Sequence, residues 1–143
     1  MEELSYPFRL EAKRLRTDSG GAGKFRGGLG IEKVYVALSP CRLLVAFDRT
    51  KCPPWGLAGG ADGAPGSVEI HRARGGREIL TKGETLIEVG DRVFVRSGGG
   101  GFGDARERAS NLVIEDVCLG FVSPEAAKRQ YGVEVPDCAS SEI

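Results

Sequence analysis

Apolar and polar residues alternate with a period of two at the start of the chain, which is the pattern of a strand with one buried face. The predicted buried face holds Leu4, Tyr6, Phe8, Leu10 and Ala12, with polar or charged residues between most of them. Further short apolar runs bounded by Gly, Pro, Asp or Ser predict strands over 31–38, 42–47, 67–72, 85–89 and 92–96. The fold class we expect is therefore mainly β, with a sandwich or barrel-like body.

The apolar spacing becomes helical beyond Asp104. Gly120 is placed to end a first helix, and Ser123-Pro124 to begin a second one that stops at Gly132. Five residues occupy one face of the first helix: Ala109, Leu112, Val113, Asp116 and Val117. We expect a single β-rich domain over 1–136 with a helical hairpin at about 106–132, and a flexible tail over 137–143.

Two glycine clusters interrupt this pattern. Residues 18–30 contain six glycines, and residues 98–103 contain five in six positions. Glycine admits positive φ and lets another chain or ligand approach the main chain. The second cluster therefore either exposes N–H groups to an anion or a neighbouring chain, or makes a tight turn between strands. Apolar segments on both sides of each cluster indicate ordered loops rather than linkers.

Charge and cysteine usage exclude several function classes. Lys plus Arg equals Asp plus Glu at 20 each, so the field that gathers nucleic acid or an anionic membrane is missing. The four cysteines form no C-x-x-C pair and His71 is the only histidine, so we expect no metal site. The polar start, the unpaired cysteines and the lack of an 18-residue apolar run predict a cytoplasmic protein without membrane contact.

The glycine motifs fail the usual nucleotide tests. Gly98, Gly100 and Gly103 match G-x-G-x-x-G, but no crossover helix and second parallel strand follow. Phe25 stands after Gly23-Lys24 where a P-loop needs Ser or Thr. We therefore expect no cofactor in this chain. His71 ends a strand pattern beside arginines, which favours a structural histidine over a catalytic base.

For three other residues the sequence leaves two possible roles open. Asp18 and Asp104 border the glycine clusters, where a carboxylate either caps backbone N–H groups or orients a substrate. Trp55 lies where a stiff prolyl segment opens into a flexible one, and either presents its ring to a ligand or another chain or packs against the β body.

Taken together, these motifs resemble the hydantoinase B/oxoprolinase family. The resemblance rests on 4–7, on the glycine-basic stretch 16–30, on 53–57 and on the cluster that begins at Gly98. Asp116, Gly120, Val122, Ala126, Ala127 and 131–133 extend it over nearly the whole chain. Ala105 and Phe102 depart from the proline and tyrosine that the family commonly has there.

The resemblance implies the C-terminal part of a hydantoinase B subunit in an ATP-dependent cyclic-amide hydrolase. It implies as partners the N-terminal part of that subunit and a hydantoinase A-like subunit, which brings ATP and Mg²⁺; related complexes carboxylate ketones. Substrate-channel or subunit-contact candidates are Asp18, Ser19, Gly20, Gly23, Arg26, Gly98, Gly99, Gly100, Gly101 and Asp104.

The catalytic residues stay undefined, and we expect the chain to be inactive alone. A free-standing, non-catalytic binding or assembly module derived from the family is the alternative, and association of identical chains is open.

Overall fold

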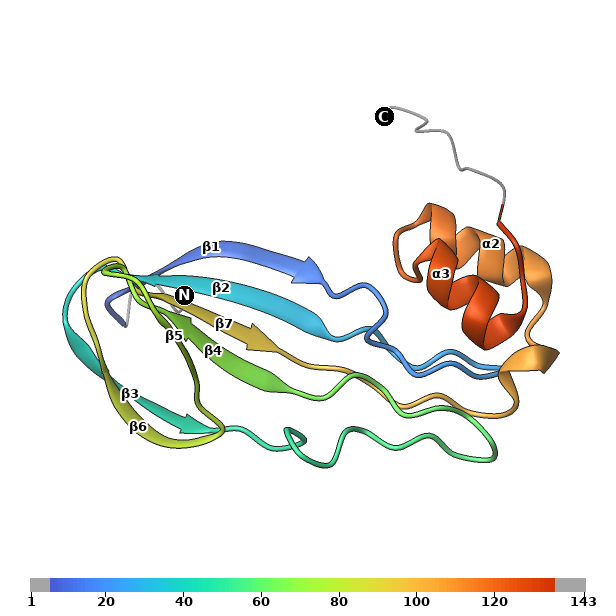
Figure 1. Ribbon diagram of the computed structural model, residues 1–143, viewed down its shortest axis with the longest axis horizontal. Helices are drawn as coiled ribbons and strands as arrows, with labels where there is room; N and C mark the ends of the chain where they lie inside the picture. The colour runs from blue at the N-terminus through green and yellow to red at the C-terminus, as the bar shows by residue number, and fades with distance from the viewer. Residues whose placement is uncertain (1–5, 136–143) are drawn as a thin grey trace. The chain divides into compact units, whose positions relative to one another are not determined.

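The computed structural model describes residues 6–135 of the 143 (Figure 1). Leu4 and the predicted tail over 137–143 lie outside the described residues. Contacts divide the chain into two compact units. Unit 1 comprises Met1–Leu15, Ile31–Cys52 and Pro65–Ser97, and unit 2 comprises Arg16–Gly30, Pro53–Ala64 and Gly98–Ile143.

Unit 1 contains seven antiparallel strands, so the mainly β prediction is confirmed. They are β1 (Phe8–Leu15), β2 (Ile31–Ala37), β3 (Cys41–Ala46), β4 (Ser67–His71), β5 (Arg77–Ile79), β6 (Lys82–Ile87) and β7 (Arg92–Arg96). Five of them form one sheet in the order β1-β2-β7-β4-β5, and β3 pairs with β6 in a second sheet. The sequence pattern missed β5, because three residues with two charges carry no periodicity.

The core of unit 1 lies between the two sheets. Val68, Ile70 and Val93 of the larger sheet pack with Val45 and Ile87 of the β3–β6 pair. Phe8 and Leu10 lie opposite core-facing positions of β2, as the alternation predicts. The register shifts between Leu10 and Ala12, so that Ala12 pairs with Val34 on the opposite face of the sheet. The prediction that Ala12 shares the buried face was therefore wrong, because a bulge breaks the period of two.

Unit 2 contains the helices. They are η1 (Ala105–Glu107), α2 (Ser110–Cys118), α3 (Pro124–Ala126) and η2 (Ala127–Tyr131). The side chain of Ser123 accepts a hydrogen bond from the N–H of Ala126 at 3.1 Å, as an N-cap does. Gly120 and Gly132 have φ of 72° and 73°, so both hold the left-handed conformation that ends a helix. The two predicted C-terminal helices are thus confirmed.

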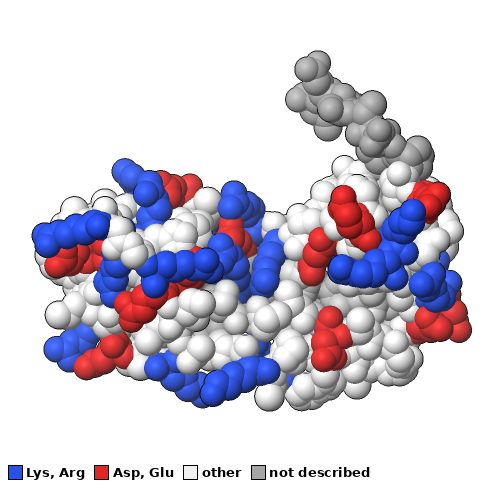
Figure 2. Space-filling view, in the orientation of Figure 1, with Lys and Arg blue, Asp and Glu red and all other residues white. Residues whose placement is uncertain are grey.

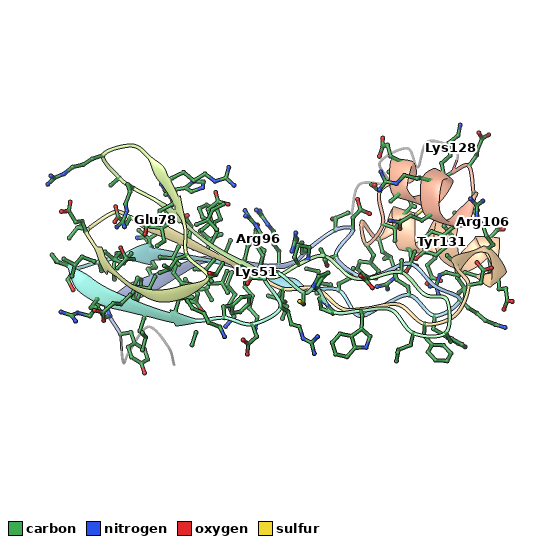
Figure 3. The ribbon with its side chains drawn as sticks, turned by 60° about the horizontal axis from the view of Figure 1, so that its bottom comes forward. Lys51, Glu78, Arg96, Arg106, Lys128 and Tyr131 are labelled. Atoms are coloured by element: carbon green, nitrogen blue, oxygen red, sulfur yellow. The ribbon has the colours of Figure 1, made fainter. Side chains whose placement is uncertain are left out.

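The core of unit 2 joins the helices to the glycine-rich segments. Val113 of α2, Ala126 of α3 and Tyr131 of η2 are buried together with Ala22, which lies in the first glycine cluster. In Figures 1 and 3 the helices lie along one side of the long extended segments of this unit. The helices therefore fix one side of the glycine clusters.

Candidate functional site

Three glycine-rich segments of unit 2 run side by side without forming a regular sheet. They span 19–28, 56–63 and 98–103 (Figure 1). Isolated bridges join them: Gly20 pairs with Gly99, while Phe102 pairs with both Phe25 and Leu57. We call this arrangement the glycine bundle. All ten residues selected from the sequence lie in unit 2: eight belong to the glycine bundle, and Asp18 and Asp104 directly flank it.

The segment 98–103 donates its N–H groups to both neighbouring segments. The N–H of Gly99 donates to the carbonyl of Ser19 at 3.2 Å, that of Gly101 to Ala61 at 2.9 Å, and that of Gly103 to Leu57 at 2.9 Å. In return, the carbonyl of Gly99 accepts from the N–H of Gly21 at 2.7 Å. The run is therefore not a tight turn, and the N–H groups of Gly99, Gly101 and Gly103 are used within the chain rather than offered to an anion.

Close packing of the main chain explains why these positions are glycine. A Cβ on Gly101 would lie 2.4 Å from the carbonyl oxygen of Ala22, and one on Gly27 would lie 2.4 Å from that of Gly99. Eleven glycines would bring a Cβ within 3.0 Å of backbone atoms in the same way: Gly20, Gly21, Gly23, Gly27, Gly56, Gly60, Gly63, Gly98, Gly99, Gly100 and Gly101. The bundle follows the rule of collagen, where only glycine fits at the crowded axis.

Positive φ plays little part in the second cluster. Among its glycines only Gly103 has a φ in the left-handed region, at 75°, and Gly98 to Gly101 do not. The constraint on Gly98 to Gly101 is the space for a side chain, not the sign of φ.

Ser19 is the first residue of the first glycine segment. Its side chain is fully buried; the hydroxyl donates to the carbonyl of Arg16 and accepts from the N–H of Gly30 at 2.8 Å. The Ser19 carbonyl accepts from Ala64 at 3.0 Å as well as from Gly99. One small residue therefore joins the first and third segments of the glycine bundle to the residue that directly follows the second.

Both candidate carboxylates bind backbone N–H groups. Asp18 accepts from the N–H of Ser123 at 2.8 Å, and Asp104 accepts from that of Arg106 at 2.9 Å at the start of η1. Asp18 has φ of 57°, a conformation that Asp tolerates better than most residues. In both contacts the carboxylate caps backbone N–H groups, and the contacts hold the ends of the bundle against the helical residues of unit 2.

Arg26 belongs to a buried ion cluster that the sequence did not single out as a site. Its Nε donates to Asp116 at 3.1 Å, and Arg108 donates to the same carboxylate oxygen at 2.9 Å. The side chains of all three are at most 16% exposed. Asp116 therefore holds two guanidinium groups, one from the glycine bundle and one from the chain before α2.

Tyr131 lies beside this ion cluster (Figure 3). It is 5% exposed, and burial raises the pKa of its phenol. The Nε of Arg108 is buried without a hydrogen-bond partner, and the Tyr131 hydroxyl makes no well-formed hydrogen bond, although the nearby backbone of Gly23 opposes the effect of burial on its pKa. The only sequence signal for the cluster was that Asp116 falls on the apolar face of a predicted helix, where a charged residue needs a partner.

A second charged cluster crosses the larger sheet of unit 1, with one residue from each strand. We call it the charge row; it consists of Arg14, Glu32, Arg96, Glu69 and Arg77, taken in strand order. The donor–acceptor distances are 2.8 Å from Arg14 to Glu32, 2.5 Å from Arg96 to Glu32, 3.1 Å from Arg96 to Glu69 and 2.7 Å from Arg77 to Glu69. Positive and negative groups alternate along the row, and Figure 2 shows both signs interspersed on the face in view.

The charge row keeps its carboxylates ionised. The hydrogen bond from Arg96 lowers the pKa of Glu32 against the opposing effect of burial, and Arg14 adds to it. Burial opposes ionisation of Glu69, but hydrogen bonds from His71, Arg77 and Arg96 outweigh it and lower its pKa as well. His71 also packs on Phe94 with 4.4 Å between ring centroids, which is the arrangement of a structural histidine.

The described residues contain neither a cluster of metal ligands nor a helix that could span a membrane. Within 6–135, His, Cys, Asp and Glu side chains nowhere gather in threes as metal ligands would. Over the same range, every helix is too short or too polar to cross a membrane.

Comparisons with known proteins agree on one family. The family model described as Hydantoinase B/oxoprolinase matches residues 1–105. An uncharacterized protein of Methanocaldococcus jannaschii is 44% identical over 136 residues, and the caprolactamase subunit beta of Pseudomonas jessenii is 37% identical over 140 residues. Each alignment covers 93% of this chain but 24% of the relative, so the chain spans about a quarter of their length.

A solved structure shows the same fold. The crystal structure of the ATP-dependent caprolactamase from Pseudomonas jessenii superposes on 96% of this chain with a TM-score of 0.80 and 28% sequence identity. The match takes up 25% of that chain. The β-rich unit and the glycine-rich unit therefore occur together as one part of a longer polypeptide.

Proposed function

The chain belongs to the hydantoinase B/oxoprolinase family, and we propose that it is the C-terminal part of a subunit that opens a cyclic amide with the help of ATP. The observation that carries this proposal is the similarity to a caprolactamase subunit over 93% of the chain, glycine bundle included. A lactam without ring strain is a poor electrophile. Transfer of the γ-phosphoryl group from ATP to the amide oxygen, with release of ADP, makes the amide carbon electrophilic enough for water to add to it. The C–N bond then breaks, the ring nitrogen takes up a proton and leaves as the amine, and a second water releases phosphate from the carboxyl group, which accounts for the use of ATP.

The glycine bundle acts in this proposal as a rigid framework beside an active site that other parts of the assembly supply. Its donors and its two candidate carboxylates, Asp18 and Asp104, already bind groups of the same chain. The ten residues selected from the sequence then shape a substrate channel or a subunit contact rather than perform the chemistry. ATP and Mg²⁺ bind to a hydantoinase A-like partner subunit, and the N-terminal part of the hydantoinase B subunit completes the site.

A hybrid enzyme tests the proposal. The matching quarter of the Pseudomonas jessenii caprolactamase subunit beta is replaced by this chain, and the hybrid is combined with the remaining subunit of that enzyme. We expect ATP-dependent opening of caprolactam to be retained. The control is the same subunit without the quarter, which is expected to be inactive. A hybrid that folds and assembles but opens no lactam contradicts the proposal.

A non-catalytic assembly module is the second candidate, and the internal use of the bundle's polar groups favours it. It predicts a different result in the same experiment. The hybrid then binds the companion subunit with unchanged affinity but shows neither lactam opening nor ketone carboxylation above the control.

A further inference from the structure

Four large apolar side chains on or next to the glycine bundle are exposed. Phe25, Trp55, Leu57 and Phe102 are 62%, 58%, 57% and 50% exposed, respectively. Phe102 pairs with Phe25 on one side and with Leu57 on the other, so these three side chains lie side by side on one face. The two phenyl rings lie 6.2 Å apart, and Trp55 precedes Leu57 by two residues. We call these four residues the aromatic face.

The aromatic face is held on rigid backbone. The N–H groups of Phe25 and Phe102 donate to each other's carbonyls, both at 3.0 Å, and Leu57 donates to Gly101 at 2.9 Å. A Cβ on Gly23 would lie 2.6 Å from the carbonyl oxygen of Phe102, so the segments have no room to move closer. Side chains fixed in this way lose little entropy when they bind, which is the property of anchor residues at an interface.

The aromatic face has the size that the largest apolar patch of a soluble protein reaches, and such patches are often functional. Three half-exposed aromatic side chains of about 200 Å² each, with a leucine, leave on the order of 400 Å² of apolar surface. Contiguous patches of this size mark binding sites in soluble proteins. Lys24, the residue before Phe25, forms an exposed ion pair with Glu107 at 3.0 Å. An apolar centre with a charged neighbour is the composition of a protein interface.

We propose that the aromatic face docks on the part of the hydantoinase B subunit that this chain does not match, a partner argued from the proposed function. The relatives are about four times as long as the matched region, so three quarters of each subunit is available to cover it. The surface that receives it is uncharged at its centre and takes two phenyl rings, a leucine and an indole. The proposed contact is the same whether that part of the subunit lies on the same polypeptide as this chain or on a separate one.

Amide hydrogen exchange of the isolated chain and of the caprolactamase hybrid tests this contact. We expect the amides of Leu57 and Phe102 to exchange at least tenfold more slowly in the hybrid, because docking suppresses local opening. Leu57→Ser is expected to remove most of that difference while leaving exchange in the isolated chain unchanged. Leu119→Ser is the matched control, since Leu119 is also 57% exposed but lies outside the aromatic face.

Two results would overturn the docking proposal. One is equal exchange of these amides in the chain and in the hybrid. The other is self-association of the isolated chain in sedimentation velocity that Leu57→Ser abolishes, because the occupant is then a second copy. If the hybrid does not fold, a hybrid with the Methanocaldococcus jannaschii relative, which is 44% identical, gives the same measurement.

The outcomes separate this inference from the proposed function. A hybrid that opens caprolactam without slowed exchange supports the proposed function and contradicts the docking proposal. Slowed exchange in a hybrid without activity supports the docking proposal and contradicts the proposed function.

Discussion

Gly100 lies directly against the main chain of Trp55. A Cβ on Gly100 would stand 2.0 Å from the carbonyl oxygen of Trp55 and 2.6 Å from its carbonyl carbon. Backbone atoms of a packed segment cannot retreat as the far end of a flexible side chain can. The contact joins the third glycine segment to the second, so the glycine bundle depends on the absence of a single methyl group at this position.

Gly100→Ala is therefore expected to destabilise the chain by about 3 kcal/mol or more, because the methyl group must separate two packed segments. Gly28→Ala is the control, since a Cβ there meets nothing within 4 Å and its φ is not left-handed. It is expected to be neutral or to stabilise by up to about 1 kcal/mol through the unfolded state. Urea unfolding of both variants measures the difference; equal midpoints would show that the bundle is not close-packed.

Local structure was largely predictable from the sequence. β7 covers the predicted range 92–96, and Ser123 and Gly132 bound the last helical segments as expected. These features depend on periodicity and on capping residues, which are local properties of the chain. The bulge between Leu10 and Ala12 was not predictable, because the alternation continues through it in the sequence.

The candidate site was predictable in its residues but not in its contacts. The clusters show where side chains are missing, yet they do not show which carbonyl lies against each glycine. That information depends on three segments that are far apart in the sequence. The same holds for Asp116, whose partner Arg26 is 90 residues away. Packing between distant segments therefore decides what the local pattern leaves open.

The charge row makes stability depend on pH. Glu32 and Glu69 have pKa values below the ordinary 4.5 in the folded state. Their contribution is present at pH values above 4.5 and is lost as the pH falls through the lower folded pKa values. We expect the urea midpoint to fall between pH 5 and pH 3, and Glu32→Gln to flatten this fall. A wild-type curve that stays level over this range would contradict the argument.

Arg96→Met tests the same row at its centre. Arg96 binds both carboxylates, so its loss leaves two buried charges with fewer partners and is expected to cost about 2 kcal/mol at pH 7. Arg74→Met is the control, because Arg74 is 87% exposed and its contact with Glu88 measures 3.5 Å. That exposed pair is expected to contribute less than about 0.5 kcal/mol.

The buried cluster of unit 2 contains two groups with opposite expected effects. Asp116→Ala leaves Arg26 and Arg108 buried without their shared carboxylate and is expected to destabilise by about 3 kcal/mol. Tyr131→Phe removes a buried hydroxyl that makes no well-formed hydrogen bond, so we expect unchanged or higher stability. Thermal unfolding of both variants checks the pair. A large loss on Tyr131→Phe would show that the hydroxyl is bonded, for example through a buried water.

The isolated chain is expected to release no phosphate from ATP and to open neither 5-oxoproline nor a hydantoin. The reason is that the N–H groups that a glycine loop would offer to a phosphate are already bonded, as those of Gly99 and Gly101 are. Asp18 and Asp104 likewise bind backbone groups. Phosphate release and ring opening are measured with Mg²⁺ present and with the active hybrid enzyme as the positive control. Saturable phosphate release that survives repurification and is lost in Asp18→Asn would contradict this expectation, because the carboxylate would then serve chemistry rather than the fold.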